Sequence, residues 1–214
     1  MQCYAIVYAL RLVAIMNSKA YLPYDASGDW LYTVVLWITL IIIVLILYLM
    51  TVPLKYTHNV HHDTWGQQYV NKKYTSLLLI VPSFILALIV RPQRSGKGFI
   101  DFCWASSMYL ESVSILPQLH MFRKNRTGEI ESFTSHYVFA MFLSKLMDFL
   151  FWMNSWQELN GYYGFISSHF AGITIIFFQI LQLGLMSSYV FYYVRSALVD
   201  SPMVLPTSMD MRSD

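Results

Sequence analysis

Charge is scarce in this sequence. Only 12% of its 214 residues are Asp, Glu, Lys or Arg, whereas soluble domains carry about 25%. The hydrophobic fraction is 57%, and the mean hydropathy is +0.48. This composition excludes an ordinary soluble domain and indicates an integral membrane protein. The net charge of +2 is too small and too scattered to indicate nucleic acid as a partner.

Reactive and metal-binding residues are also few. The two cysteines, Cys3 and Cys103, lie in apolar stretches, so they predict small buried side chains and no disulfide framework. Three histidines, His58, His61 and His62, share a polar connection that offers no convincing further metal ligand. The sequence contains no nucleophile with a nearby base and no phosphate-binding loop. It therefore predicts a protein that is not an enzyme and that needs no cofactor or metal.

Long apolar runs dominate instead. A helix that crosses a bilayer needs about 20 apolar residues, so the chain has room for six or seven such helices in a single domain, 1–214. The run at 30–52 contains no charged residue. The first run has no basic leader and no cleavage site, so it does not resemble a signal peptide. We expect spans at about residues 2–16, 30–52, 76–90, 99–119, 135–156 and 165–195, followed by a tail at 196–214.

Basic residues set the expected orientation, because Lys and Arg are enriched in cytosolic loops. An orientation with both termini cytosolic places seven basic residues on the cytosolic side and four on the lumenal side. The tail at 196–214 is then cytosolic. The seven are Lys55, Lys72, Lys73, Arg123, Lys124, Arg126 and Arg195, and the four are Lys19, Arg91, Arg94 and Lys97.

Two ionisable residues interrupt the apolar runs. Glu111 lies within the fourth run, where a carboxylate is costly unless it faces a polar cavity and has a partner. Arg11 lies within the first run, where a guanidinium costs at least about 2.5 kcal/mol. We expect Arg11 either to face a cavity or to extend along the short helix to the membrane surface. Pro117 follows Glu111 and either kinks the helix or simply ends it before a loop.

A family resemblance rests on the residues around Glu111. Residues 109–119 read Tyr-Leu-Glu-Ser-Val-Ser-Ile-Leu-Pro-Gln-Leu, followed by Thr-Gly-Glu at 127–129 and Thr-Ser-His-Tyr at 134–137. These blocks resemble the endoplasmic reticulum (ER) lumen protein retaining receptors, also known as KDEL receptors. Shorter matches are Val81-Pro82 and Tyr4-Ala5. The similarity extends over roughly residues 4–195.

The resemblance implies an all-α integral membrane protein with a SWEET/PQ-loop-like bundle. Such proteins have seven helices, arranged as two three-helix bundles joined by a linking helix. Six spans are expected here, and the matching residues begin at what should be the family's second helix. We therefore expect the first helix to be absent, either because the gene model is truncated or because the protein has lost that helix.

The resemblance also implies a function. Such receptors bind the C-terminal KDEL-like tetrapeptide of escaped ER lumenal proteins in the Golgi and return them to the ER in a pH-dependent manner. The implied location is the ER and Golgi membranes, with multiple spans. The implied partners are the tetrapeptide, membrane lipids and vesicle coat proteins, and not nucleic acid. The alternative is a small-solute transporter or a non-binding relative with the same fold.

Four residues match ligand-binding positions of the family. Arg11 is implied to hold the peptide's terminal carboxylate, for which a bidentate guanidinium is suited. Asp101 is implied to lie at the lumenal mouth of the cavity, and Trp104 to line it. Trp152 is implied to stack near the peptide's lysine. Two alternatives remain: Asp101 as an exposed charge at a helix N-terminus, and Trp152 as a residue of the lipid interface.

Glu111 and Lys145 are implied to form an intramembrane charge pair. Lys145 stands where the family has arginine, so the charge is kept and the planar fork is lost. Asp148, three residues further on, is an alternative local partner for Lys145. His136 and His169 are candidates for proton sensing, because a histidine side chain ordinarily titrates near pH 6.5.

Several positions depart from the family pattern. Leu12 and Ala14 replace a tyrosine and an aspartate, and Ser144, Asp148 and Ser155 replace two tyrosines and an arginine. The tail also lacks the lysines expected for coat-dependent retrieval. The chemistry expected for peptide recognition is thus only half intact, which keeps the transporter alternative open.

Overall fold

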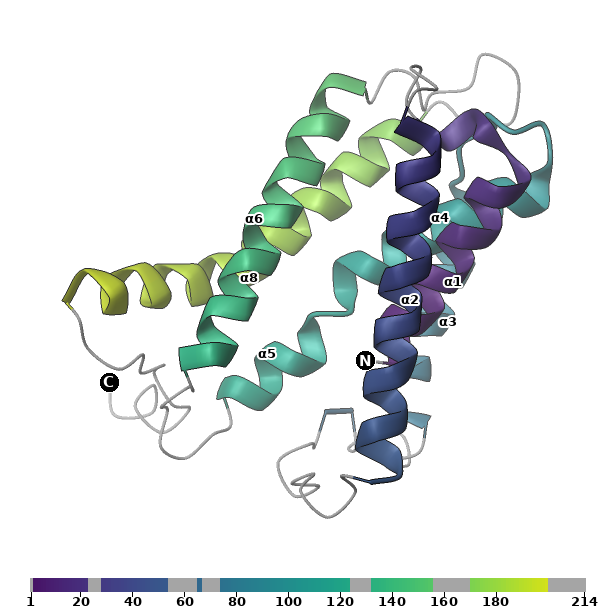
Figure 1. Cartoon of the computed structure of the whole chain (residues 1–214). Coiled ribbons are helices and arrows are strands. Elements are labelled where there is room, and N and C mark those ends of the chain that lie inside the picture. The colour runs from purple at the N-terminus through teal and green to yellow at the C-terminus, as the bar shows by residue number, and fades with distance from the viewer. Residues whose placement is uncertain are drawn as a thin grey trace.

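The computed structural model describes residues 2–22, 28–53, 65–66, 74–123, 132–155 and 170–199. Within these ranges all regular structure is helical, which confirms the all-α prediction. The elements are α1 (Gln2–Asn17), the short 3-10 helix η1 (Lys19–Tyr21), α2 (Asp29–Thr51), α3 (Leu77–Ile89), α4 (Gly98–Val113), α5 (Leu116–Arg123), α6 (Ser132–Ser155) and α8 (Ala171–Val199) (Figure 1).

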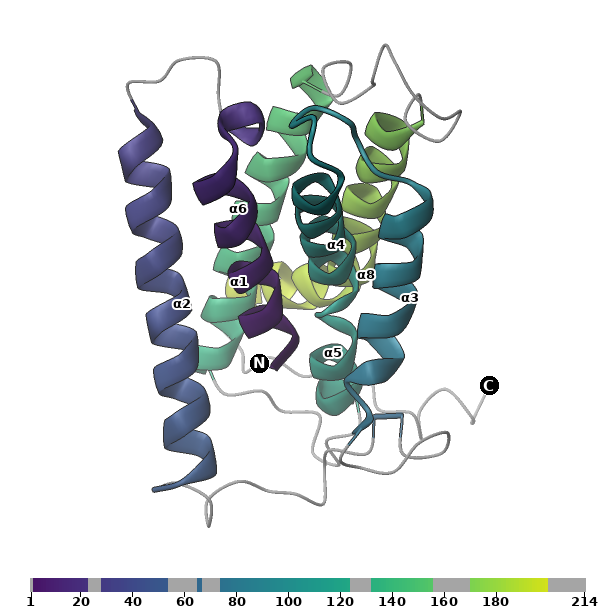
Figure 2. The same ribbon diagram turned by 90° about the vertical axis from the view of Figure 1, so that its right-hand side faces the viewer.

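Helix α4 forms the centre of the bundle. It packs against α1, α3 and α8, and 12 of its 16 residues are buried. Helix α6 packs against α8. Helix α2 packs against α1 and stands at the edge of the molecule (Figure 2). Side chains of α4 therefore meet neighbours on all sides, and a polar residue in α4 must find its partners inside the bundle.

The outer helices are apolar on their exposed faces. By length and composition, α2 and α8 could each cross a membrane, and α1 and α3 are shorter apolar helices. The only residues of α2 that are buried in the bundle are Leu36 and Ile43. A helix that exposes large apolar side chains over most of its surface requires an apolar solvent. The lipid bilayer provides that solvent in a membrane protein.

The fourth expected span, 99–119, is broken into two helices. Helix α4 ends at Val113 and α5 begins at Leu116. The break precedes Pro117, which has no N–H to donate to the Val113 carbonyl. The N–H of Ser114 is shared between the carbonyls of Leu110 and Glu111 at 3.0 and 3.2 Å. Glu111 consequently lies in the last turn of α4.

Other boundaries differ by a few residues from the expected spans. Pro82 lies inside α3 without ending it. Helix α6 begins at Ser132, earlier than expected, and α8 continues to Val199, past the expected end at 195. The start of the sixth expected span, 165–169, lies outside the described residues. Helix α8 bends near its middle (Figure 1).

Candidate functional site

One face of α4 carries the candidate site. Asp101, Trp104, Met108 and Glu111 are spaced three, four and three residues apart, which places them on one side of a helix. The stripe is about 15 Å long, from the rise of about 1.5 Å per residue. All four residues are buried. The stripe meets residues of α1, η1 and α6. We use the name seam for this stripe together with its neighbours, that is, for Arg11, Tyr21, Asp101, Trp104, Met108, Glu111, Lys145, Asp148 and Trp152.

A chain of ion pairs crosses the seam. The Nη2 of Arg11 lies 2.6 Å from Oε2 of Glu111. The Nζ of Lys145 lies 2.7 Å from Oε1 of the same carboxylate. Each oxygen of Glu111 thus accepts from a cation on a different helix. This carboxylate joins α1, α4 and α6, which explains how a residue that is only 3% exposed can remain charged.

Lys145 makes both of the contacts considered from the sequence. Besides Glu111, its Nζ binds Oδ2 of Asp148 at 2.9 Å. Asp148 is partly exposed at 46%, so the chain of charges reaches from the interior to the surface of α6. Two cations and two carboxylates alternate along it. Their formal charges cancel along this chain, and Asp101 is a third carboxylate at the other end of the seam.

Arg11 points into the bundle, and its side chain is only 17% exposed. It does not extend to the membrane surface, which was one of the two expectations. Its Nη2 also contacts the sulfur of Met108 at 3.1 Å, and the guanidinium lies 6.0 Å from the centre of the Tyr8 ring. Its Nε and Nη1 make no hydrogen bond to any residue that the structure describes. Nη2 is therefore fixed by Glu111 and Met108, while Nε and Nη1 keep N–H groups that a ligand could accept from.

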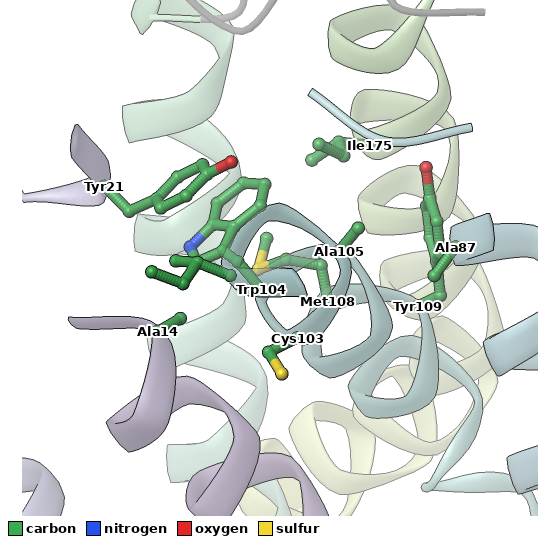
Figure 3. Close-up of a cluster of buried hydrophobic side chains, with 10 residues drawn as sticks. Ala14, Tyr21, Ala87, Cys103, Trp104, Ala105, Met108, Tyr109 and Ile175 are labelled. Carbon is green, nitrogen blue, oxygen red and sulfur yellow. The ribbon is translucent and has the colours of Figure 1, made fainter. Parts of the chain in front are cut away.

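Aromatic rings occupy the other end of the seam. The Tyr21 ring stacks on the Trp104 indole at 4.5 Å with an interplanar angle of 12°. Figure 3 shows these two rings face to face, with Met108 beside Trp104. The Trp152 ring meets Trp104 edge-on at 5.3 Å. Trp152 is half-buried and packs against the core cluster around Trp104. In this structure Trp152 faces the seam, which argues against the alternative of a lipid-facing residue.

Asp101 is buried, with 1% of its surface exposed, so it is not the exposed helix-end charge that was the alternative expectation. Its Oδ1 accepts a hydrogen bond from the Tyr21 hydroxyl and another from the backbone N–H of Ser95 at 3.1 Å. Gly96 has a φ of +69° in this turn, a conformation that glycine adopts readily. Burial, and then the hydrogen bond to Asp101, raise the pKa of the Tyr21 hydroxyl.

The histidines lie away from the seam or outside the described residues. The Nδ1 of His136 lies 2.6 Å from the Tyr193 hydroxyl, so this exposed side chain links α6 to α8. His169 and the histidines at 58, 61 and 62 fall outside the described ranges. Among the residues that the structure describes, no group of three or more His, Cys, Asp or Glu side chains is placed to hold a metal ion.

Sequence reasoning missed two residues of the seam. Met108 lies four residues after Trp104 and three before Glu111, so helical spacing alone could have identified it. Tyr21 is 80 residues from Asp101 and lies in a loop-like stretch, where no local pattern indicates a partner. The direct contact between Arg11 and Glu111 was also not predicted, because it depends on how α1 packs against α4.

Comparisons with known proteins identify the family of this chain. The family model described as "ER lumen protein retaining receptor" matches residues 1–155. The chain belongs to this family. The match confirms the resemblance inferred from the residues around Glu111, all of which lie within the matched range. The name of this family describes receptors.

Individual relatives in this family are moderately similar. The ER lumen protein-retaining receptor of Drosophila melanogaster is 31% identical over 159 residues, which cover 74% of this chain and 64% of the fly protein. The protein of the same name from Caenorhabditis briggsae is 39% identical over 94 residues, which cover 44% of this chain and 38% of the nematode protein. ER lumen protein-retaining receptor 2 of Gallus gallus is 29% identical over 204 residues, covering 95% and 81%. The chain thus spans less than two thirds of the fly and nematode relatives.

Proposed function

We propose that this protein is a retrieval receptor that binds the C-terminal KDEL-like tetrapeptide of escaped ER lumenal proteins in the Golgi and returns them to the ER. Its proposed location is the ER and Golgi membranes, and its proposed partners are the tetrapeptide, membrane lipids and coat proteins. Family membership supports the general role. The seam supports the specific ligand, because it combines a cation, a carboxylate and aromatic rings inside an apolar bundle.

The observation that carries the proposal is the arrangement of Arg11. Glu111 holds the guanidinium through Nη2, while Nε and Nη1 have no hydrogen-bond partner among the described residues. Each N–H group of a guanidinium can donate a charge-assisted hydrogen bond to a carboxylate. The C-terminal carboxylate of the peptide would accept from Nε or Nη1 of Arg11.

The other end of the seam would receive the peptide's positive residue. Trp152 offers a ring face for a lysine ammonium, and Asp101 supplies the opposite charge nearby. Trp104 is only 2% exposed because Tyr21 covers it. Peptide entry therefore requires the Tyr21 ring to move from Trp104, or the peptide to bind beside the pair.

Binding should be tighter at pH 5.5–6 than at pH 7.4, as retrieval from a more acidic compartment requires. Of the two candidate proton acceptors, Glu111 is held charged by its ion pairs with Arg11 and Lys145. His136, on the α6–α8 contact with Tyr193, is therefore the proposed one.

A binding titration tests the proposal. Purified protein is titrated by calorimetry with a peptide ending in Lys-Asp-Glu-Leu and with the same peptide carrying a C-terminal amide. The free acid should bind at least about tenfold tighter, because a charge-assisted hydrogen bond contributes about 1.5–3 kcal/mol. Arg11→Gln should remove this difference. The matched control is Arg195→Gln, which removes an exposed arginine of α8 and should leave the affinity unchanged.

The second candidate is a small-solute transporter or a non-binding relative. It is favoured by the balance of charge around Arg11, where Asp148 binds Lys145 at 2.9 Å and completes an ion-pair chain of two cations and two carboxylates. A cavity whose charges are already paired attracts an anionic peptide terminus less strongly. Equal and weak binding of the acid and the amide peptides would favour this candidate over the receptor.

A further inference from the structure

A hollow of about 400 Å³ lies where α1 ends and α2 begins. Its lining includes Met16, Asn17, Lys19, Asp29, Trp30 and Thr33. The volume falls within the range of about 300–1,000 Å³ that is usual for small-molecule sites. The hollow lies on the α2 side of α1, and none of the seam residues lines it. It is therefore a separate place on the molecule.

The hollow contains an ion pair that is only partly satisfied. The Nζ of Lys19 lies 3.3 Å from Oδ2 of Asp29, and the two side chains are 81% and 17% exposed. The other oxygen, Oδ1, is buried and has no hydrogen-bond partner among the described residues. A buried carboxylate oxygen without a donor is unfavourable. A ligand with an N–H group would therefore stabilise this site.

The hollow lies at the beginning of an apolar span. The charge-free run of α2 starts at Trp30, directly after Asp29. Trp30 and Tyr32 are exposed at 68% and 48%, and such aromatic residues are typical of the level of the lipid headgroups. Helix α2 stands at the edge of the bundle, with α1 as its neighbour (Figure 2). The polar hollow thus opens at the boundary between water and lipid.

We propose that this hollow binds the headgroup of phosphatidylethanolamine. On binding, the Asp29 carboxylate turns so that Oδ1, which is buried in the unbound protein, accepts a hydrogen bond from the primary ammonium. The phosphate pairs with the exposed ammonium of Lys19. The acyl chains lie along the exposed apolar surface of α2. A choline headgroup carries no N–H, so it cannot satisfy Oδ1. A glycerol headgroup carries no cation to pair with Asp29.

Native mass spectrometry of the full chain in detergent tests the proposal. The protein is titrated with phosphatidylethanolamine, phosphatidylcholine and phosphatidylglycerol of the same acyl composition. Phosphatidylethanolamine should bind about tenfold tighter than phosphatidylcholine, the effect expected for one charge-assisted hydrogen bond. Asp29→Asn should reduce this preference severalfold, because the amide oxygen still accepts the hydrogen bond but without the negative charge.

A second pair of variants tests the phosphate contact. Lys19→Gln should weaken the binding of phosphatidylethanolamine severalfold. The control, Lys97→Gln, removes an exposed lysine from the turn before α4 and should have no effect. Because Lys19 is largely exposed, its replacement leaves the fold intact, so this pair gives a result even if Asp29→Asn fails to fold.

Three outcomes would overturn the assignment. The first is an Asp29→Asn protein that prefers phosphatidylethanolamine as strongly as the unaltered chain does. The second is a Lys19→Gln protein that binds this lipid as tightly as the unaltered chain. The third is soluble phosphoethanolamine binding as tightly as the lipid, which would identify a site for a free zwitterion and not for a membrane lipid. None of these outcomes bears on tetrapeptide binding at Arg11.

Discussion

Glu111 binds side chains of two other helices and so connects α1 and α6 to α4 within the seam. Its oxygens accept from Arg11 of α1 and from Lys145 of α6 at 2.6 and 2.7 Å. A carboxylate buried to this degree is favourable only while its partners remain in place. Loss of the carboxylate would leave two cations with no acceptor between them inside an apolar bundle.

Glu111→Gln should therefore destabilise the protein by about 3–5 kcal/mol, the usual cost of removing one partner of a buried pair. Lys145→Met should also destabilise it. The double variant should lose less stability than the sum of the two, with a coupling energy of about 1–3 kcal/mol. Thermal unfolding in detergent measures all three. Strictly additive losses would contradict the pairing, and Glu111→Gln combined with Lys97→Gln provides an additive control.

Tyr21 gives a prediction about pH. Its hydroxyl donates to the buried Asp101, and burial followed by this hydrogen bond raises its pKa above the ordinary value. Since the pKa is higher in the folded state, the stabilisation is fully present below the unfolded pKa of about 10 and is lost as the pH rises further.

Tyr21→Phe should accordingly lower the unfolding free energy by about 1–3 kcal/mol, because Asp101 loses a donor. The difference from the unaltered protein should be constant between pH 6 and 9 and should shrink above about pH 10. Melting temperatures recorded across this range measure it. A difference that grows at high pH would contradict the assigned hydrogen bond.

Among the elements, α4 shows how much can be predicted from sequence. The apolar runs predict where most helices lie, and the spacing of Asp101, Trp104 and Glu111 places them on one face. The break between α4 and α5 is less predictable. Pro117 indicates an interruption of the helix, but it does not by itself specify that α4 ends at Val113. The contacts of Arg11 and Tyr21 with α4 depend on packing between distant segments, which no periodicity encodes.

Helix α8 presents an unusual buried face. Ile175, Gln179, Gln182, Met186 and Tyr189 follow one another at helical spacing and are all buried. Two glutamines thus lie within an otherwise mainly apolar stripe. The Oε1 of Gln179 and the Nε2 of Gln182 have no hydrogen-bond partner among the described residues. Unsatisfied polar atoms in such a position are destabilising.

Gln179→Met and Gln182→Met should each raise the unfolding free energy by about 1–2 kcal/mol, since methionine nearly conserves volume and removes the unpaired atoms. Thermal unfolding of each single variant measures the effect. A fall in melting temperature would instead indicate that the glutamines hold a water molecule or a ligand. Gln118→Met, in the half-buried part of α5, is the control and should have little effect.

At the scale of the whole molecule, the hollow and the part of the seam around Asp101 lie at the same end of the helix bundle. Tyr21, Asp101 and the hollow all lie near the ends where α1 finishes and α4 begins. The opposite end carries the N-terminus of α1 and the end of α5 (Figure 1). The excess of basic residues predicts that this opposite end is cytosolic, so that Asp101 and the Nε and Nη1 groups of Arg11 would be reached from the lumen.

Cysteine labelling of sealed microsomes tests this orientation. The native Cys3 and Cys103 are buried, so they should react slowly and leave a low background. Lys97→Cys, in the turn before α4, should be protected from a membrane-impermeant maleimide until detergent is added. Leu198→Cys, an exposed position at the far end of α8, should react in intact vesicles. The reverse pattern would place Asp101 and Tyr21 on the cytosolic side, where lumenal cargo is absent, and would exclude retrieval through the seam.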